Sequence, residues 1–184
     1  MRLFVAINLP RDLRDAILAA AAPLRARPLP VRWVDPDGLH LTLKFLGEVA
    51  DERLPEIVTA LARACVGARP FPLEVGGFGA FPNPSRPRVV WVGCETAPPL
   101  ELLQHGVERA FADIGFPVEG RPFRPHLTLG RAKADARGEV RGLEDRLEAL
   151  AFADTFTVTS VDLMESTLTP RGARYTVRHA VALG

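Results

Sequence analysis

The tetrapeptide His-Leu-Thr-Leu occurs twice in this 184-residue chain, at residues 40–43 and at residues 126–129, and the two copies hold two of its four histidines. Successive side chains of a β-strand alternate between its two faces, so each copy predicts a strand with histidine and threonine on one face and leucines on the other. One such strand alone is most simply a structural strand with a polar outer face. Two copies with the same spacing instead favour a site to which both halves of the chain contribute.

Outward from these motifs, apolar strand-like runs alternate with segments of helical spacing. Strands are predicted over residues 3–7, 31–34, 39–46, 71–78, 88–92, 123–130, 153–164 and 174–181. Helices are predicted over residues 10–22, 51–65, 100–114 and 139–150. Strands in consecutive pairs favour antiparallel sheets, and therefore an α+β fold. We predict one bilobal domain over residues 1–184, with two pseudo-symmetric lobes around a central cleft, each lobe an antiparallel sheet with helices on its outer side.

The composition is typical of a globular protein, with 47% hydrophobic and 24% charged residues. A formal net charge of +1 argues against a protein that grips nucleic acid by bulk electrostatics, and favours a short or small phosphate ligand. Cys65 and Cys94 are too few for a disulfide framework, so they are interpreted as core thiols in a reducing compartment. The apolar run at residues 3–7 is too short for a signal peptide or a membrane span. A cytoplasmic location and no membrane partner are therefore expected.

Two histidines that face each other suit proton transfer, because their ordinary pKa near 6.5 allows one to be neutral while the other is protonated. In-line displacement at phosphorus needs both states, since a base activates the nucleophile while an acid protonates the departing oxygen. The hydroxyls of Thr42 and Thr128 can hold the non-bridging phosphate oxygens. Arg131, at the end of the second motif strand, either adds a charge-assisted contact or is a solvated strand-end arginine.

A zinc site is the competing interpretation of paired histidines, but it requires a third protein ligand, and neither motif contains Asp, Glu or Cys. No metal and no other cofactor are therefore expected. The chain also lacks the Gly-rich loop of nucleotide hydrolases and the Gly-x-Ser-x-Gly elbow of serine hydrolases.

With these residues in place, the chain resembles the two-histidine (2H) phosphoesterase superfamily, in its branch of RNA 2′,3′-cyclic phosphodiesterases, also called 2′-5′ RNA ligases. The resemblance extends over nearly the whole chain and depends chiefly on the paired motifs. The matching segments are residues 1–7, 32–34, 40–47, 90–93, 125–131 and 166–168, with Gly172 and Tyr175.

This resemblance implies metal-independent hydrolysis of RNA-terminal or nucleoside 2′,3′-cyclic phosphates to 2′-phosphates. It implies that His40 protonates the departing 3′ oxygen and that His126 activates water; the residues themselves leave that assignment open. Thr42, Thr128 and Arg131 match the family's phosphate-holding residues.

Two aromatic residues also acquire expected roles from the resemblance, Phe45 in stacking on a base and Tyr175 in lining the cleft. For Phe45 there is a competing interpretation, because strict strand alternation puts it on the apolar face with Leu41 and Leu43. A bend or bulge in the strand is needed to turn it outward.

The expected partners are RNA ends or nucleotides that carry a 2′,3′-cyclic phosphate, and a monomer is expected. Reverse 2′-5′ ligation uses the same chemistry, with a 5′-hydroxyl in place of water, but the abundance of water favours hydrolysis. The alternative from a different class is a noncatalytic nucleotide- or RNA-binding module that uses the same cleft. Loss of a motif histidine or threonine is expected in such a module, and all four are present.

Overall fold

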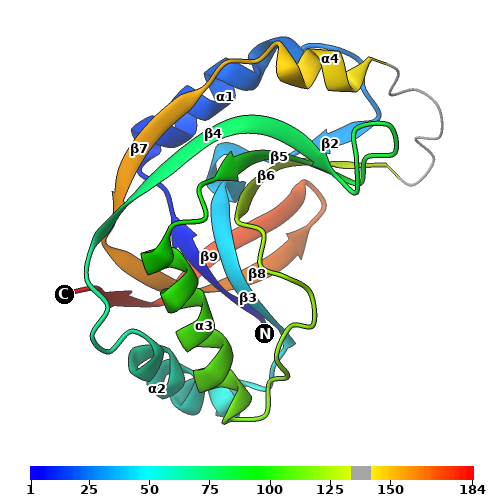
Figure 1. The fold of residues 1–184 in the computed structure, drawn as a ribbon. Helices are drawn as coiled ribbons and strands as arrows, with labels where there is room; N and C mark the ends of the chain where they lie inside the picture. The colour runs from blue at the N-terminus through cyan, green and yellow to red at the C-terminus, as the bar shows by residue number, and fades with distance from the viewer. Residues whose placement is uncertain (134–141) are drawn as a thin grey trace.

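The computed structural model describes residues 1–133 and 142–184, and in these residues nine strands form one curled sheet (Figure 1). The strands are β1 (Arg2–Asn8), β2 (Val31–Trp33), β3 (His40–Glu48), β4 (Phe71–Phe81), β5 (Val89–Cys94), β6 (His126–Ala132), β7 (Ala153–Val158), β8 (Ser160–Thr169) and β9 (Gly172–Ala182). The helices are α1 (Arg11–Arg25), α2 (Leu54–Ala64), α3 (Pro98–Ala112) and α4 (Leu143–Glu148), with short 3-10 turns η1 (Pro36–Gly38) and η2 (Asp51–Arg53).

The two motif strands lie next to each other at the centre of this sheet, whose order is β7-β4-β5-β6-β3-β1-β8-β9, with β2 paired to β6. Four strands therefore form one lobe (β6-β5-β4-β7) and four form the other (β3-β1-β8-β9). All the pairings are antiparallel, and the lobes join where Leu41 pairs with Leu127. These two residues hold the same position in their motifs, so a pseudo-twofold axis passes through this pair. The predicted α+β fold with two lobes is confirmed, and the lobes share one continuous sheet.

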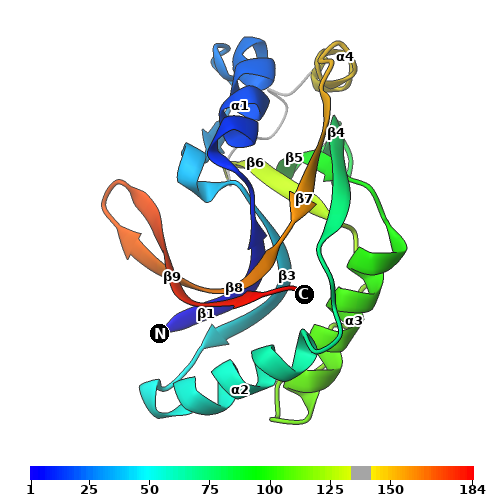
Figure 2. The same ribbon diagram turned by 90° about the vertical axis from the view of Figure 1, so that its left-hand side faces the viewer.

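The helices cover the face of the sheet that carries the motif leucines. In α1, the buried residues Leu13, Ile17, Ala21 and Leu24 recur at helical spacing and so form one apolar stripe. Helices α1 and α4 lie together at one end of the molecule and α2 and α3 at the other, in both views (Figures 1 and 2). One core cluster contains buried residues of these helices and of both motif strands. We call this side of the sheet the helix face and the opposite side the histidine face.

Two sequence-based boundaries differ from the structure in informative ways. The strand predicted over residues 153–164 is two strands, because β7 pairs with β4 in one lobe while β8 pairs with β1 in the other. The hydrogen-bond partners change around Thr159, and so does the alternation, because the core residues are Phe156 and Val158 before it and Val161 and Leu163 after it. The helix predicted over residues 139–150 is present as α4, and its predicted residues 139–141 lie outside the described part of the chain. Among the described residues, no helix is long and apolar enough to cross a membrane.

Candidate active site

The register of the two central strands brings the histidines and threonines of both motifs to one face. Leu41 and Leu127 pair across the strands and are buried on the helix face, being 1% and 0% exposed. Extending this antiparallel register by one residue puts His40 opposite Thr128 and Thr42 opposite His126. Diagonal neighbours on one face, such as the two histidines, have Cα atoms about 7–8 Å apart where strands stay paired. Each histidine therefore has the threonine of the other motif beside it.

Both motif strands contain the same irregularity, a β-bulge three residues after the histidine. In β3, Val5 pairs with Lys44 and Ala6 with Thr42, which leaves Leu43 as the extra residue. In β6, Val90 pairs with Gly130 and Trp91 with Thr128, which leaves Leu129 as the extra residue. A bulge of this kind puts two consecutive residues on one side and reverses the alternation beyond it.

The bulges decide where the next side chain of each strand points. Leu43 and Lys44 are both buried, and Phe45 is 67% exposed. The phenyl rings of Phe45 and Phe4 are 6.0 Å apart, and the ring of Phe4 is 4.8 Å from the imidazole of His40. Phe45 therefore lies on the histidine face, and the interpretation from strict alternation is wrong at this residue. Arg131 holds the same position after the bulge of β6 and is also exposed.

Aromatic rings pack against both imidazoles. His40 has Phe4 on one side and Tyr175 on another, with ring centroids 4.8 Å and 5.0 Å away. His126 has Phe81 in edge contact at 5.0 Å. The sequence analysis included Tyr175 but missed Phe4 and Phe81. Phe4 lies in an apolar strand, and Phe81 lies beside a proline-rich loop. No local sequence pattern therefore distinguishes either residue from a core residue.

Burial lowers the pKa of both histidines, and the positive charge of Arg131 lowers both further. For His40 the pKa falls from 6.5 to about 4. For His126 the lowering is opposed by a hydrogen bond, in which Nδ1 donates to the carbonyl of Arg124 at 2.7 Å. That bond leaves Nε2 of the neutral ring able to accept a proton. Since Arg131 acts on both rings, the three side chains form one electrostatic unit.

The lowered histidine pKa values predict a loss of stability in acid. Between pH 6.5 and about 4 the unfolded chain binds a proton at residue 40 that the folded chain resists, so the free energy of unfolding falls as the pH drops through this window. For His40 the full effect is up to roughly 3 kcal/mol. Urea unfolding at pH 7 and pH 4.5 should show a smaller acid-induced loss in His40→Gln than in the wild type. His105→Gln, at an exposed site on α3, is the control and should behave as the wild type; an equal loss in all three proteins would contradict the prediction.

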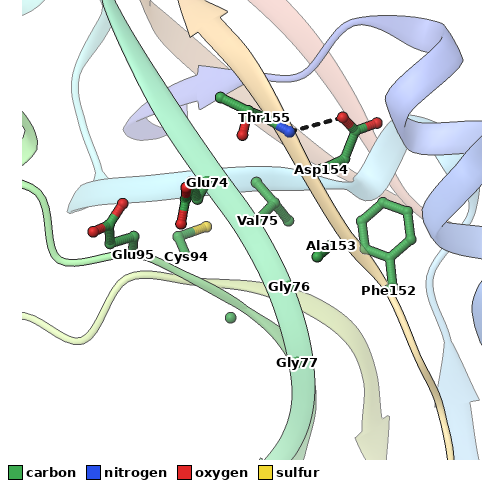
Figure 3. A pocket seen from close by; sticks show the side chains of 11 residues that line it. Glu74, Val75, Gly76, Gly77, Cys94, Glu95, Phe152, Ala153, Asp154 and Thr155 are labelled. Carbon is green, nitrogen blue, oxygen red and sulfur yellow. Dashed lines mark hydrogen bonds between the residues drawn. The ribbon is translucent and has the colours of Figure 1, made fainter.

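A hollow of about 660 Å³ lies over β4, β5 and β7 and is separate from this site (Figure 3). Its lining residues are Glu74, Val75, Gly76, Gly77, Gly93, Cys94, Glu95, Phe152, Ala153, Asp154 and Thr155. Neither motif histidine is among them, and its three carboxylate side chains repel a phosphate. In residues 1–133 and 142–184, no three His, Cys, Asp or Glu side chains converge as metal ligands.

A curled antiparallel sheet with a His-x-Thr strand from each lobe at its centre defines a class, the two-histidine phosphoesterases. The profile of the family described as LigT like Phosphoesterase matches residues 7–91 and again residues 92–175, so each match contains one motif. The chain belongs to this family.

Several known proteins are similar to this chain over nearly their whole length. The RNA 2′,3′-cyclic phosphodiesterase of Methanothermobacter thermautotrophicus is 35% identical over 184 residues, which cover 96% of this chain and 95% of the relative. The crystal structure of TT0787 of Thermus thermophilus matches with a TM-score of 0.86 at 33% identity, covering 100% of this chain and 98% of that chain. The crystal structure of E. coli LigT complexed with 3′-AMP matches with a TM-score of 0.79 at 32% identity, covering 99% of this chain and 97% of that chain. The resemblance identified from the motifs is confirmed.

Proposed function

We propose that this protein hydrolyses RNA-terminal or nucleoside 2′,3′-cyclic phosphates to 2′-phosphates by metal-independent acid–base catalysis with two histidines. The observation that carries the proposal is the pairing of Leu41 with Leu127 at the same position of the two motifs. Strand alternation from this pair directs His40 and His126 to one face, each across from the other motif's threonine. Relatives that carry the name RNA 2′,3′-cyclic phosphodiesterase at 33–36% identity support the substrate class.

His126 is the general base in this proposal and His40 the general acid. The Nδ1 hydrogen bond of His126 to the Arg124 carbonyl leaves Nε2 to take a proton from the attacking water. His40 gives its proton to the departing 3′ oxygen. Its pKa of about 4 leaves the ring neutral in the free protein at neutral pH. The negative charge of a bound phosphate raises that pKa, so substrate binding and proton uptake by His40 are coupled.

Different residues on the histidine face bind the phosphate and the nucleobase of the substrate. The hydroxyls of Thr42 and Thr128 and the guanidinium of Arg131 hold the non-bridging oxygens while negative charge builds on them. Phe45 is exposed and free to stack on the base, a contact worth about 1–3 kcal/mol. Tyr175 lines the site through its contact with His40.

We also propose that residues 1–184 act as one bilobal monomer. Both motifs come from one chain, and one core cluster includes buried residues of both lobes, such as Val5 and Val92. The site is therefore complete without a second copy. Reverse 2′-5′ ligation requires a bound 5′-hydroxyl end, so hydrolysis is the main reaction of the proposal.

The test is incubation of the purified protein with adenosine 2′,3′-cyclic phosphate in excess EDTA, with the product isomer identified by chromatography. Conversion to the 2′-phosphate at the rate seen without EDTA is the expected result. Formation of the 3′-phosphate would refute the assignment of the departing oxygen. Loss of turnover in EDTA would refute metal independence, and a 2′-5′ joined product in excess over the hydrolysed one would reverse the order of hydrolysis and ligation.

A further inference from the structure

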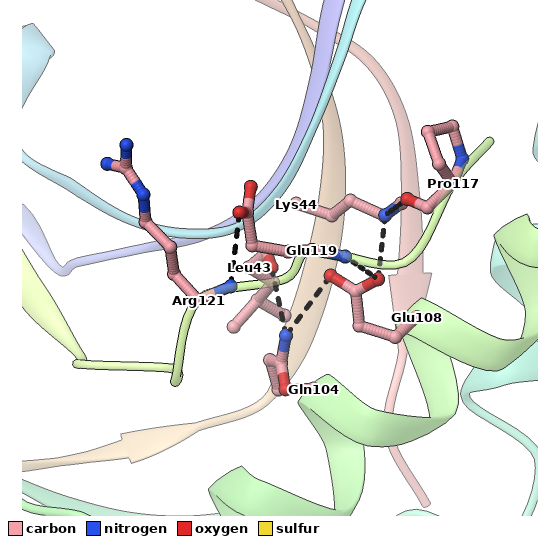
Figure 4. A network of polar contacts seen from close by, with 7 residues as sticks. All are labelled: Leu43, Lys44, Gln104, Glu108, Pro117, Glu119 and Arg121. Atoms are coloured by element: carbon pink, nitrogen blue, oxygen red, sulfur yellow. Dashed lines mark hydrogen bonds and ion pairs between the residues drawn. The ribbon is translucent and has the colours of Figure 1, made fainter.

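The strand that carries the first motif is attached to α3 by a buried ion pair. Lys44 Nζ lies 2.7 Å from Glu108 Oε2 and donates to the carbonyl of Pro117 at 2.8 Å (Figure 4). The two charged side chains are only 4% and 8% exposed. Burial of such a pair has a desolvation cost that can cancel its attraction, so the pair is weak evidence for stability. Its location is more informative, because Lys44 follows the bulge residue Leu43 and directly precedes Phe45.

Further contacts tie the same helix to the bulge and to the chain that leads into the second motif. Gln104 Nε2 makes long hydrogen bonds to the carbonyl of Leu43 at 3.5 Å and to Glu108 Oε1 at 3.4 Å. Glu108 Oε2 also accepts the backbone N–H of Glu119 at 3.2 Å. We call Lys44, Gln104 and Glu108 the α3 clamp. It joins the bulge of β3, α3 and residues 117–119 (Figure 4).

The other lobe holds its equivalent bulge in a different way. Gly130 corresponds to Lys44, and a Cβ atom there would lie 2.5 Å from Val31 Cγ1 and 2.7 Å from Trp33 Cε3. Strand β2 thus covers the bulge of β6 directly and requires glycine. On β3 the buried Lys44 side chain occupies the corresponding place and reaches the segment at residues 117–119. Each bulge is therefore fixed by packing, one by strand β2 and the other by Lys44. The bulges direct Phe45 and Arg131 to the histidine face, so the position of these two side chains depends on that packing.

We propose that Lys44, through its ion pair with Glu108, is a positioning residue that fixes the β3 bulge, presents Phe45 on the histidine face and thereby sets the affinity for the base beside the cyclic phosphate. This inference rests on the proposed function and concerns the same site. Lys44 itself lies on the helix face and acts through Phe45, so it affects substrate binding more than the chemical step.

The variant K44M/E108Q tests this proposal. It removes both buried charges together, and the glutamine still accepts the Glu119 N–H, so the protein is expected to fold. The control is R63Q/D113N, which removes an exposed ion pair between α2 and the end of α3. In that pair a guanidinium nitrogen of Arg63 lies 3.1 Å from Asp113 Oδ2. Hydrogen exchange of the backbone amides of residues 43–46, 118 and 119 should become several-fold faster in K44M/E108Q and stay unchanged in the control. Unchanged exchange in K44M/E108Q would overturn the proposal whether or not the protein is active.

A double-mutant cycle with F45A distinguishes an effect that acts through the position of Phe45 from a general destabilisation of the site. For adenosine 2′,3′-cyclic phosphate, K44M/E108Q should raise KM about fivefold with kcat within about twofold, since stacking contributes to binding. In the F45A background the same substitutions should change neither constant. Equal effects with and without Phe45, or a loss confined to kcat, would overturn the proposal. If the wild type does not turn over this compound, the proposed function fails, and the same cycle is then measured from dissociation constants of the intact cyclic phosphate.

Discussion

Replacing either motif histidine with alanine is expected to lower kcat for cyclic-phosphate hydrolysis by about 10²–10⁴-fold. His40 and His126 hold equivalent positions in the two lobes, and in-line displacement needs a base on one side of the phosphorus and an acid on the other. The loss of either histidine therefore removes either the activation of water or the protonation of the departing oxygen. Steady-state kinetics of H40A and H126A on adenosine 2′,3′-cyclic phosphate measures the effect.

A substrate with an activated leaving group distinguishes the acid from the base. A good leaving group departs without protonation, so H40A should be rescued on this substrate while H126A should not. Equal rescue would remove the support for the assignment of His40 as acid. H105A, at the exposed α3 histidine, is the matched control and should keep wild-type kinetics. Full activity in H40A or H126A would refute two-histidine catalysis itself.

Replacing either motif threonine with valine is expected to lower kcat by about 10²–10³-fold, the typical cost of removing one donor to a developing negative charge. Valine keeps the branched shape of threonine and suits a strand, so T42V and T128V remove the hydroxyl with little effect on the fold. The effect should fall on kcat more than on KM, because the charge on the phosphate oxygens grows in the transition state.

The serine variants T42S and T128S provide the control, since they restore a hydroxyl at the same position. They should recover most of the activity that the valine variants lose. If valine and serine gave the same activity at both positions, the threonines would be structural residues of the strands. The pseudo-twofold relation adds a further expectation: T42V and T128V should have effects of similar size, since each threonine lies beside the histidine of the other motif.

The shared face of histidine and threonine in each motif could be predicted from the sequence because it depends on local geometry. The spacing in His-Leu-Thr-Leu puts histidine and threonine on one face of any β-strand, whatever the rest of the fold. The repeat of that spacing predicted two equivalent lobes, and the consecutive strands predicted antiparallel sheets. The family resemblance followed from the same segments. The helices were also predictable, since each depends on apolar residues at helical spacing within a short window.

The tertiary structure alone decided the features that depend on partners distant in the sequence. The bulges after Thr42 and Thr128 arise from pairing with β1 and β5, and they turn Phe45 and Arg131 to the histidine face against simple alternation. The pairing of β3 with β6 made the motif strands neighbours in one sheet, and burial together with Arg131 lowered the histidine pKa values. The partner of Lys44 is Glu108, 64 residues away on α3. A strand's own sequence sets which side chains share a face, whereas its register, its bulges and the charges around it are set by neighbours that only the folded chain brings together.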